Sequence, residues 1–266
     1  MGSVFRFQED AVFRLPGPQA VVHFGGVAAS DPAAGISGTA SRRGSLLTGE
    51  VGAGKSTAAR VFTAALNPAL FKILYVHFSS GAALDLLRPI APTLDLEPAH
   101  YRGGLVRQIA GAVARLNQSK KQHPLLIVDE AHLLPHPALE QLPLLLNFDM
   151  DSSRYLTLLL IGQPLLRRTL SPQMHEALRQ RVSTHFHPEG LAREELDAYL
   201  AQQLKAAGVT HPLFEDTARQ GLFQATKGIP RKVNKLALTA LRLAAERKAS
   251  MVTESLLLDA TAESFL

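Results

Sequence analysis

The sequence of 266 residues contains no cysteine and no tryptophan, and aromatic residues make up only 6% of it. Without cysteine, disulfide bonds, catalytic thiols and cysteine-ligated zinc are excluded. Long apolar runs are also missing, because segments 125–128, 142–146 and 156–161 are too short to cross a bilayer. The first residues lack the charged and then apolar pattern of a signal peptide. We therefore expect a cytoplasmic protein that does not engage a membrane.

The composition is that of an ordinary globular protein, with 46% hydrophobic and 19% charged residues. The length allows one large α/β domain and a smaller second one. A formal net charge of +5 and an isoelectric point near 9.6 favour polyanions as partners. A modest excess of charge spread over a whole chain does not by itself identify such a partner.

The most informative motif lies at residues 49–56, which match the pattern G-x-x-x-x-G-K-[ST] of a phosphate-binding loop. Its small residues permit positive φ angles, so that backbone N–H groups form a nest for phosphate oxygens. Lys55 would direct its charge toward the β- and γ-phosphates, and Ser56 would offer a hydroxyl to Mg²⁺. A short apolar strand is predicted at 45–47 and a helix at 55–66, whose positive end would face the phosphates.

A second motif follows the apolar run 125–128, where Asp129 and Glu130 end a predicted buried strand. Such carboxylates point into the crevice at the carboxyl end of a parallel sheet. We predict that Asp129 binds Mg²⁺, directly or through water, and that Glu130 orients the attacking water. The nucleotide-binding residues expected from both motifs are Gly49, Glu50, Val51, Gly52, Ala53, Gly54, Lys55, Ser56, Thr57 and Asp129. Ser56 and Asp129 are the expected metal ligands.

His132 completes an Asp-Glu-Ala-His tetrad that also occurs in helicases. The chain is too short for two helicase core domains, so we set that interpretation aside. His132 is instead expected to pack near the site or to support one of its residues.

Further predicted strands at 71–78, 155–161 and 182–186 alternate with predicted helices at 82–94, 105–116 and 138–147. Such alternation favours a parallel sheet with helices on both faces. From residue 191 onward only helices are predicted, at 194–207, 216–226, 230–248 and 254–265. We predict an irregular segment at 1–43 with one short strand at 20–24, a nucleotide-binding domain at 44–190 and a small helical domain at 191–266.

Four more polar residues are candidates for the site. Gln163 follows the strand at 155–161 and would lie near the γ-phosphate. Arg179 and Arg181 precede the next strand, and in a ring one of them would reach the nucleotide of a neighbouring subunit. Arg231 lies in the first turn of helix 230–248, where domain closure would bring it onto the phosphates. Each also has a purely structural interpretation. Gln163 could be an ordinary turn residue, the two arginines before the strand surface charge, and Arg231 part of a solvated basic face.

Five stretches of the sequence together resemble a known family: residues 47–55, 128–134, 161–164, 180–182 and 228–234. Through them the chain resembles AAA+ ATPases, and within these the ExeA-like group that includes transposition helpers of the TnsC and TniB type. The resemblance implies a P-loop α/β domain with a helical lid, and the cofactors ATP and Mg²⁺. It also implies that Gln163 is sensor 1, Arg181 the arginine finger with Arg179 as alternative, and Arg231 sensor 2.

In function, the resemblance implies a ring or helical homo-oligomer on duplex DNA that selects a target and activates a partner transposase. DNA-backbone contacts are expected at Arg102, Arg107, Lys120 and Lys121. One alternative is a secretion-associated ATPase of the same group, and another is a nucleotide-switched regulatory module with little hydrolysis. The chain departs from the family at 25–44, which is rich in glycine and serine where relatives have a helix that contributes to the adenine pocket.

Overall fold

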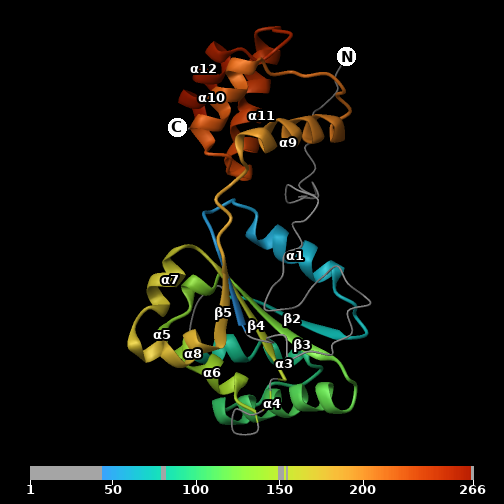
Figure 1. The fold of residues 1–266 in the computed structure, drawn as a ribbon, viewed down its shortest axis with the longest axis vertical. Coiled ribbons are helices and arrows are strands. Elements are labelled where there is room, and N and C mark those ends of the chain that lie inside the picture. Colours follow the sequence, from blue (N-terminus) through green and yellow to red (C-terminus); the bar gives the residue numbers. More distant parts are fainter. Residues whose placement is uncertain (1–43, 79–81, 149–152, 154, 265–266) are drawn as a thin grey trace. The chain divides into compact units, whose positions relative to one another are not determined.

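The computed structural model describes residues 44–78, 82–148, 153 and 155–264. These residues form two compact units (Figure 1). The α/β unit comprises residues 44–49 and 55–187, and the helical unit comprises residues 50–54 and 188–264. The strand predicted at 20–24 lies outside the described residues.

The α/β unit is built on five parallel strands in the order β2-β3-β4-β1-β5. The strands are β1 (Gly44–Thr48), β2 (Phe71–His77), β3 (His123–Asp129), β4 (Thr157–Gly162) and β5 (Val182–Phe186). Every residue of β1, β3 and β4 is buried, whereas the edge strand β2 ends in alternating buried and exposed residues. The continuous apolar runs of the sequence therefore mark the central strands, as predicted for a sheet covered on both faces.

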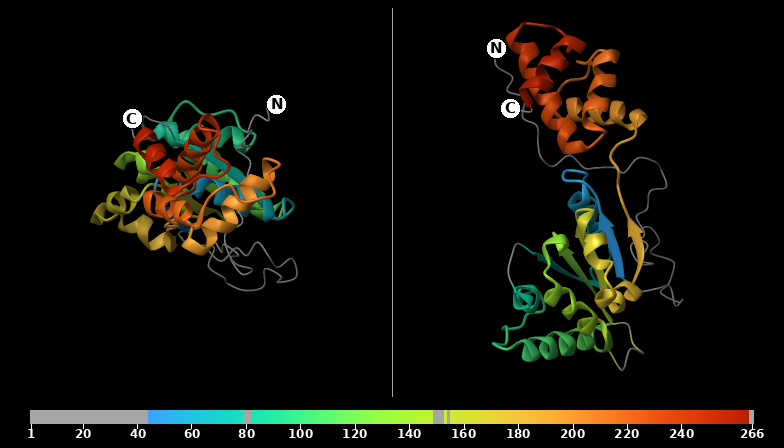
Figure 2. Two further views of the ribbon diagram at one scale, coloured as in Figure 1. Left: turned by 90° about the horizontal axis from the view of Figure 1, so that it is seen from above. Right: turned by 90° about the vertical axis from the view of Figure 1, so that its left-hand side faces the viewer.

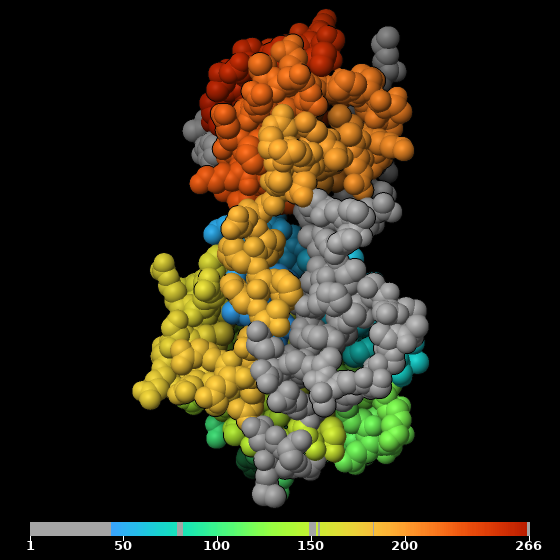
Figure 3. All heavy atoms as spheres, viewed as in Figure 1, coloured from blue at the N-terminus to red at the C-terminus, as the bar shows by residue number. Residues whose placement is uncertain are grey.

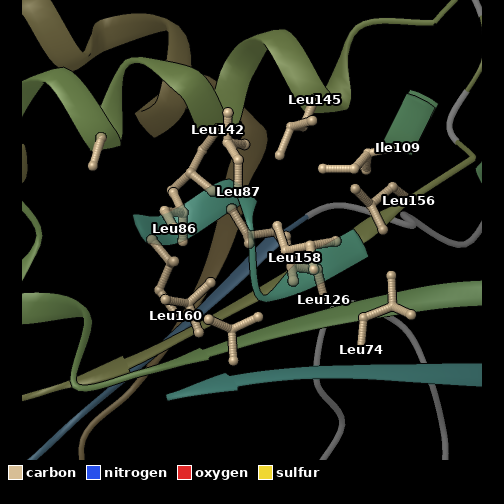
Figure 4. Close-up of a cluster of buried hydrophobic side chains, with 14 of the residues drawn as sticks. Leu74, Leu86, Leu87, Ile109, Leu126, Leu142, Leu145, Leu156, Leu158 and Leu160 are labelled. Carbon is tan, nitrogen blue, oxygen red and sulfur yellow. The ribbon is translucent and has the colours of Figure 1, made fainter. Parts of the chain in front are cut away.

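Helices cover both faces of this sheet. On one face, leucines of β2, β3 and β4 pack against α2 (Ala83–Leu87), α4 (Arg102–Gln118) and α6 (Gln141–Leu146), as Figure 4 shows. On the other face, Ala59 and Phe62 of α1 (Lys55–Ala65) pack against Leu47, Ile127 and Ile161. Each fully buried leucine or phenylalanine contributes about 1.5–3 kcal/mol. The predicted parallel sheet between two helical layers is confirmed.

Two predicted helices are each broken in two. Residues 82–94 form α2 and α3 (Ile90–Thr93), and residues 138–147 fall in α5 (His136–Leu139) and α6. Proline causes both breaks, because its ring clashes with the carbonyl four residues earlier and it lacks the N–H that would bond it. Pro89 interrupts the first helix and Pro143 prevents α5 from continuing.

The remaining elements of the α/β unit are short: η1 (Ala131–Leu133), α7 (Leu165–Leu170), η2 (Gln173–His175) and α8 (Glu176–Arg181). Figure 3 shows the segment from α7 to β5, in yellow and orange, on the visible surface of this unit. Arg179 at the end of α8 is exposed and Arg181 is half-buried.

The helical unit contains α9 (Arg193–Ala206), α10 (Asp216–Thr226), α11 (Pro230–Glu246) and α12 (Glu254–Ser264), seen in orange and red in Figure 2. Their apolar faces share one core, which includes Leu196, Leu222 and Val233. The turn before α11 requires glycine at position 228, where φ is +68° and an added Cβ would lie 2.1 Å from the Leu191 carbonyl oxygen. This close approach lets the Leu191 N–H donate to the Gly228 carbonyl at 2.8 Å.

Candidate nucleotide-binding site

The predicted phosphate-binding loop has the positive φ angles that its glycines permit. Gly52 and Gly54 have φ angles of +84° and +88°. The Ala53 N–H donates to the Glu50 carbonyl at 3.1 Å and closes a tight turn. Left-handed backbone of this kind is where successive N–H groups form anion-binding nests.

The residues that flank the loop belong to the α/β unit and lie at the carboxyl edge of its sheet. Lys55 begins α1, is 9% exposed and donates from Nζ to the Gly49 carbonyl at 2.8 Å. The Gly49 N–H donates to the Gly162 carbonyl at 3.2 Å and ties the end of β1 to the end of β4. Gln163 follows Gly162 directly, so this bond brings it close to Gly49.

Asp129 lies at the end of β3, is 4% exposed and accepts three hydrogen bonds. Its Oδ2 accepts from the Ser56 hydroxyl and from the Tyr75 hydroxyl, each at 3.0 Å. Its Oδ1 accepts from the Glu130 N–H at 2.8 Å. The fold thus brings together Ser56 and Asp129, the two metal ligands predicted from segments 73 positions apart.

The chemistry of this donor set fits Mg²⁺. Hydroxyl and carboxylate oxygens are hard ligands, and Mg²⁺ is usually bound by one or two protein oxygens while phosphates and water complete its shell. Among the described residues, no group of three or more His, Asp or Glu side chains could hold a metal ion. Ser56 and Asp129 would therefore act together with a bound triphosphate.

Tyr75 is a contact of the site that the sequence analysis missed. It lies on β2, where it pairs with Ile127 of β3, two residues before Asp129. Partial burial raises the pKa of Tyr75 to about 12, together with the charge of Asp129 and the hydrogen bond to it. The phenol therefore remains a donor at physiological pH. The only signal in the sequence was an aromatic residue near the end of the strand beside β3.

Glu130 has a left-handed backbone, with φ 55° and ψ 32°, which is uncommon for a residue with a side chain. The Nδ1 atom of His132 lies 3.2 Å from Glu130 Oε2, in a contact that is not aligned as a hydrogen bond. His132 also packs on the end of β4, since a Cβ added to Gly162 would lie 3.1 Å from the His132 backbone nitrogen. His132 thus both packs and contacts Glu130.

A second missed cluster holds the end of β1. The Thr48 hydroxyl lies 2.7 Å from His185 Nε2 and 2.9 Å from His187 Nδ1. Burial lowers the pKa of His185, and the nearby charges of Arg167 and His187 lower it further. These contacts fix the residue that precedes Gly49.

The two candidate arginine fingers lie at the amino ends of the strands, whereas Asp129 lies at the carboxyl ends. Arg181 donates to the Ala177 carbonyl at 3.0 Å and Arg179 to the Ser171 carbonyl at 2.7 Å. Val182, the next residue, pairs with Gly44 at the start of β1. A five-residue strand, roughly 15 Å long at about 3.3 Å per residue, separates this edge from the edge with Asp129. The fold therefore does not bring either arginine to Asp129 of the same unit.

Arg231 belongs to the helical unit, where Pro230 occupies the first position of α11. Its backbone N–H donates to the Gly52 carbonyl at 3.3 Å, within that same unit, and the residue is exposed.

Among the described residues, no helix is both long and apolar enough to cross a membrane.

Comparison with known proteins agrees with this geometry. Residues 39–170 match the AAA domain family. Aeropyrum pernix ORC2 in its ADP form has a similar fold, with a TM-score of 0.59 and 16% identity over 83% of this chain and 62% of that one. The Thermotoga maritima RuvB Holliday junction branch migration motor gives a TM-score of 0.52 and 19% identity over 83% and 61% of the two chains. The fold is the P-loop AAA fold.

One curated relative is similar in sequence as well. General secretion pathway protein A of Aeromonas hydrophila is 36% identical over 199 residues, which cover 74% of this chain and 36% of that protein. The match agrees with the resemblance to the ExeA-like group that the motifs indicate. The chain spans just over a third of this relative.

Replacing Lys55 by alanine should weaken MgATP binding at least tenfold, because the substitution removes the buried cation expected to face the phosphates. Calorimetric titration of wild type and Lys55→Ala with MgATP measures the change. Lys72→Ala, on the half-buried edge strand β2, is the matched control and should bind as wild type does. Equal affinity of Lys55→Ala and wild type would show that the loop does not bind this nucleotide.

Proposed function

We propose that the chain is a Mg²⁺-dependent ATPase that hydrolyses ATP to ADP and phosphate. The observation that carries this proposal is the hydrogen bond from Ser56 to Asp129, because it joins the residue after Lys55 to the carboxylate that ends β3. Lys55 binds the β- and γ-phosphates, and Ser56 and Asp129 hold the metal. Bound Mg²⁺ would neutralise charge on the phosphate oxygens.

In the proposed reaction, Glu130 orients a water molecule and accepts its proton as the water oxygen attacks the γ-phosphorus. The bond from that phosphorus to the ADP oxygen breaks and ADP leaves. Gln163 hydrogen-bonds the γ-phosphate or the water. Gly49 and Gly162 support this assignment, because their backbone hydrogen bond places Gln163 beside the start of the loop.

The proposal includes assembly into a ring or a helical filament. Phosphoryl transfer is commonly accelerated by an arginine supplied from a neighbouring molecule, by roughly 10³–10⁵-fold. Arg181, or Arg179 beside it, is at the sheet edge opposite Asp129, so a second copy of the chain would have to supply it. Arg231 is proposed to act on the nucleotide of its own chain.

A role linked to secretion is supported by the similarity to general secretion pathway protein A. In this role the module would couple ATP hydrolysis to the assembly or movement of export components. Because the chain spans 36% of that protein, the role is proposed for the ATPase module alone.

A second candidate role is that of a transposition helper that binds duplex DNA and activates a transposase. The net charge of +5 favours it, as does the exposure of Arg102, Arg107, Lys120 and Lys121. The two arginines lie on the first turns of α4 and the two lysines follow its last turn. A helix of this length separates its ends by roughly 25 Å, so the pairs would contact different phosphates.

The assembly proposal predicts that two inactive variants restore each other. Glu130→Gln should lower the turnover number at least a hundredfold while it retains ATP binding, since a positioned base contributes about 10²–10⁴-fold. Arg181→Ala should also be inactive. In a mixture, some interfaces pair an intact Glu130 with an intact Arg181, and phosphate release should reappear.

Glu97→Gln, an exposed acid, is the control. A mixture as inactive as its components would contradict a finger supplied in trans.

The two roles differ in their prediction for duplex DNA. A transposition helper should bind it without regard to sequence, more tightly with ATP than with ADP, and with a salt slope of roughly −0.9 per phosphate contacted. Filter binding over a salt series measures this for wild type and for Lys120→Ala/Lys121→Ala. The matched control is Lys232→Ala/Lys248→Ala in the helical unit. Affinity that is absent or indifferent to salt would favour the secretion-linked role.

A further inference from the structure

Tyr75 reaches the metal-binding carboxylate from outside both nucleotide-binding motifs. Its hydroxyl donates to Asp129 Oδ2 at 3.0 Å, the same oxygen that accepts from Ser56. The ring is carried by β2, whose register with β3 is fixed by continuous pairing from Phe71 with His123 to His77 with Asp129. The residue is 49% exposed, so the contact does not result from close packing of a core side chain.

Among the described residues, three donors contact the Asp129 carboxylate and leave one acceptor site open. An ionised carboxylate has about four acceptor sites, two on each oxygen. Ser56 and Tyr75 occupy both sites on Oδ2, and the Glu130 N–H occupies one on Oδ1. The remaining site on Oδ1 is therefore the one available to a metal ion or to a water molecule bound to it.

We propose that Tyr75 is a positioning residue, which holds the Asp129 carboxylate in the orientation from which it would bind Mg²⁺. The inference rests on the proposed function and extends it to a residue that neither motif contains. The Ser56 hydroxyl would share its oxygen between Asp129 and the metal, whereas the phenol of Tyr75 donates to Asp129 alone in the described residues. Tyr75 thereby sets the Mg²⁺ concentration at which nucleotide binds.

The test is Tyr75→Phe, which removes one oxygen and keeps the ring. It should raise the Mg²⁺ concentration for half-maximal ATP binding about tenfold, the change expected for one hydrogen bond to a charged acceptor. ATP affinity in EDTA should be unchanged, because the metal is then absent. Tyr155→Phe is the matched control, since its hydroxyl accepts a bond from Gln118 instead.

A second readout uses the tyrosines themselves, because the chain has four of them and no tryptophan. The emission of a tyrosine changes when its hydrogen-bonded carboxylate binds a metal. Addition of Mg²⁺ with inorganic tripolyphosphate, which does not absorb where tyrosine does, should therefore alter the emission of wild type and Tyr155→Phe. Tyr75→Phe should show no such change.

The outcomes separate the two proposals. If wild type binds ATP and Tyr75→Phe has the same Mg²⁺ midpoint, the positioning role is wrong and the proposed function stands. An equal loss of affinity with Mg²⁺ and in EDTA would also overturn it, since the residue would then be structural. A wild type that binds no nucleotide at any Mg²⁺ concentration would overturn the proposed function itself.

Discussion

The hydrogen bonds to the Asp129 carboxylate are the constraint on which the proposed site depends. A buried charge without partners costs several kcal/mol, and Asp129 avoids this cost through Ser56, Tyr75 and the Glu130 backbone. These donors come from α1, β2 and the residue that follows β3. The carboxylate is therefore satisfied only when the helix after the loop and two neighbouring strands are all in place.

Close backbone approach at the end of β4 is the second requirement. The Gly162 carbonyl accepts from Gly49, while His132 and Leu166 lie where a side chain would stand, each 3.1 Å from an added Cβ. Glycine here lets the segment after Glu130 lie against the strand that leads to Gln163. The acid, the amide and the start of the loop are thus drawn together by backbone contacts.

The sequence predicted those parts of the fold that depend on local pattern. The strand at 182–186 and the helix at 216–226 have the predicted ends, and the phosphate loop has its positive φ angles. The predictions of unbroken helices at 82–94 and 138–147 were wrong, although the breaks at Pro89 and Pro143 follow from local rules. What the sequence could not supply is strand register, which alone places Tyr75 beside Asp129 and His185 beside Thr48.

The same limit applies to the arginines. That Arg179 and Arg181 precede a strand is visible in the sequence, and the parallel direction of that strand sets them at the amino ends of the strands, opposite Asp129. Because of this placement, an arginine finger would have to come from a second copy of the chain. The similarity to general secretion pathway protein A extends over 74% of this chain.

The central claim, that Asp129 joins the metal to the nucleotide, is tested most directly by ATP binding and phosphate release in Asp129→Asn. This substitution keeps the shape of the side chain and removes its charge. The account predicts equal ATP affinity of wild type and Asp129→Asn in EDTA, tighter binding with Mg²⁺ in wild type alone, and no phosphate release from the variant. Release of phosphate by Asp129→Asn at the wild-type rate would contradict it.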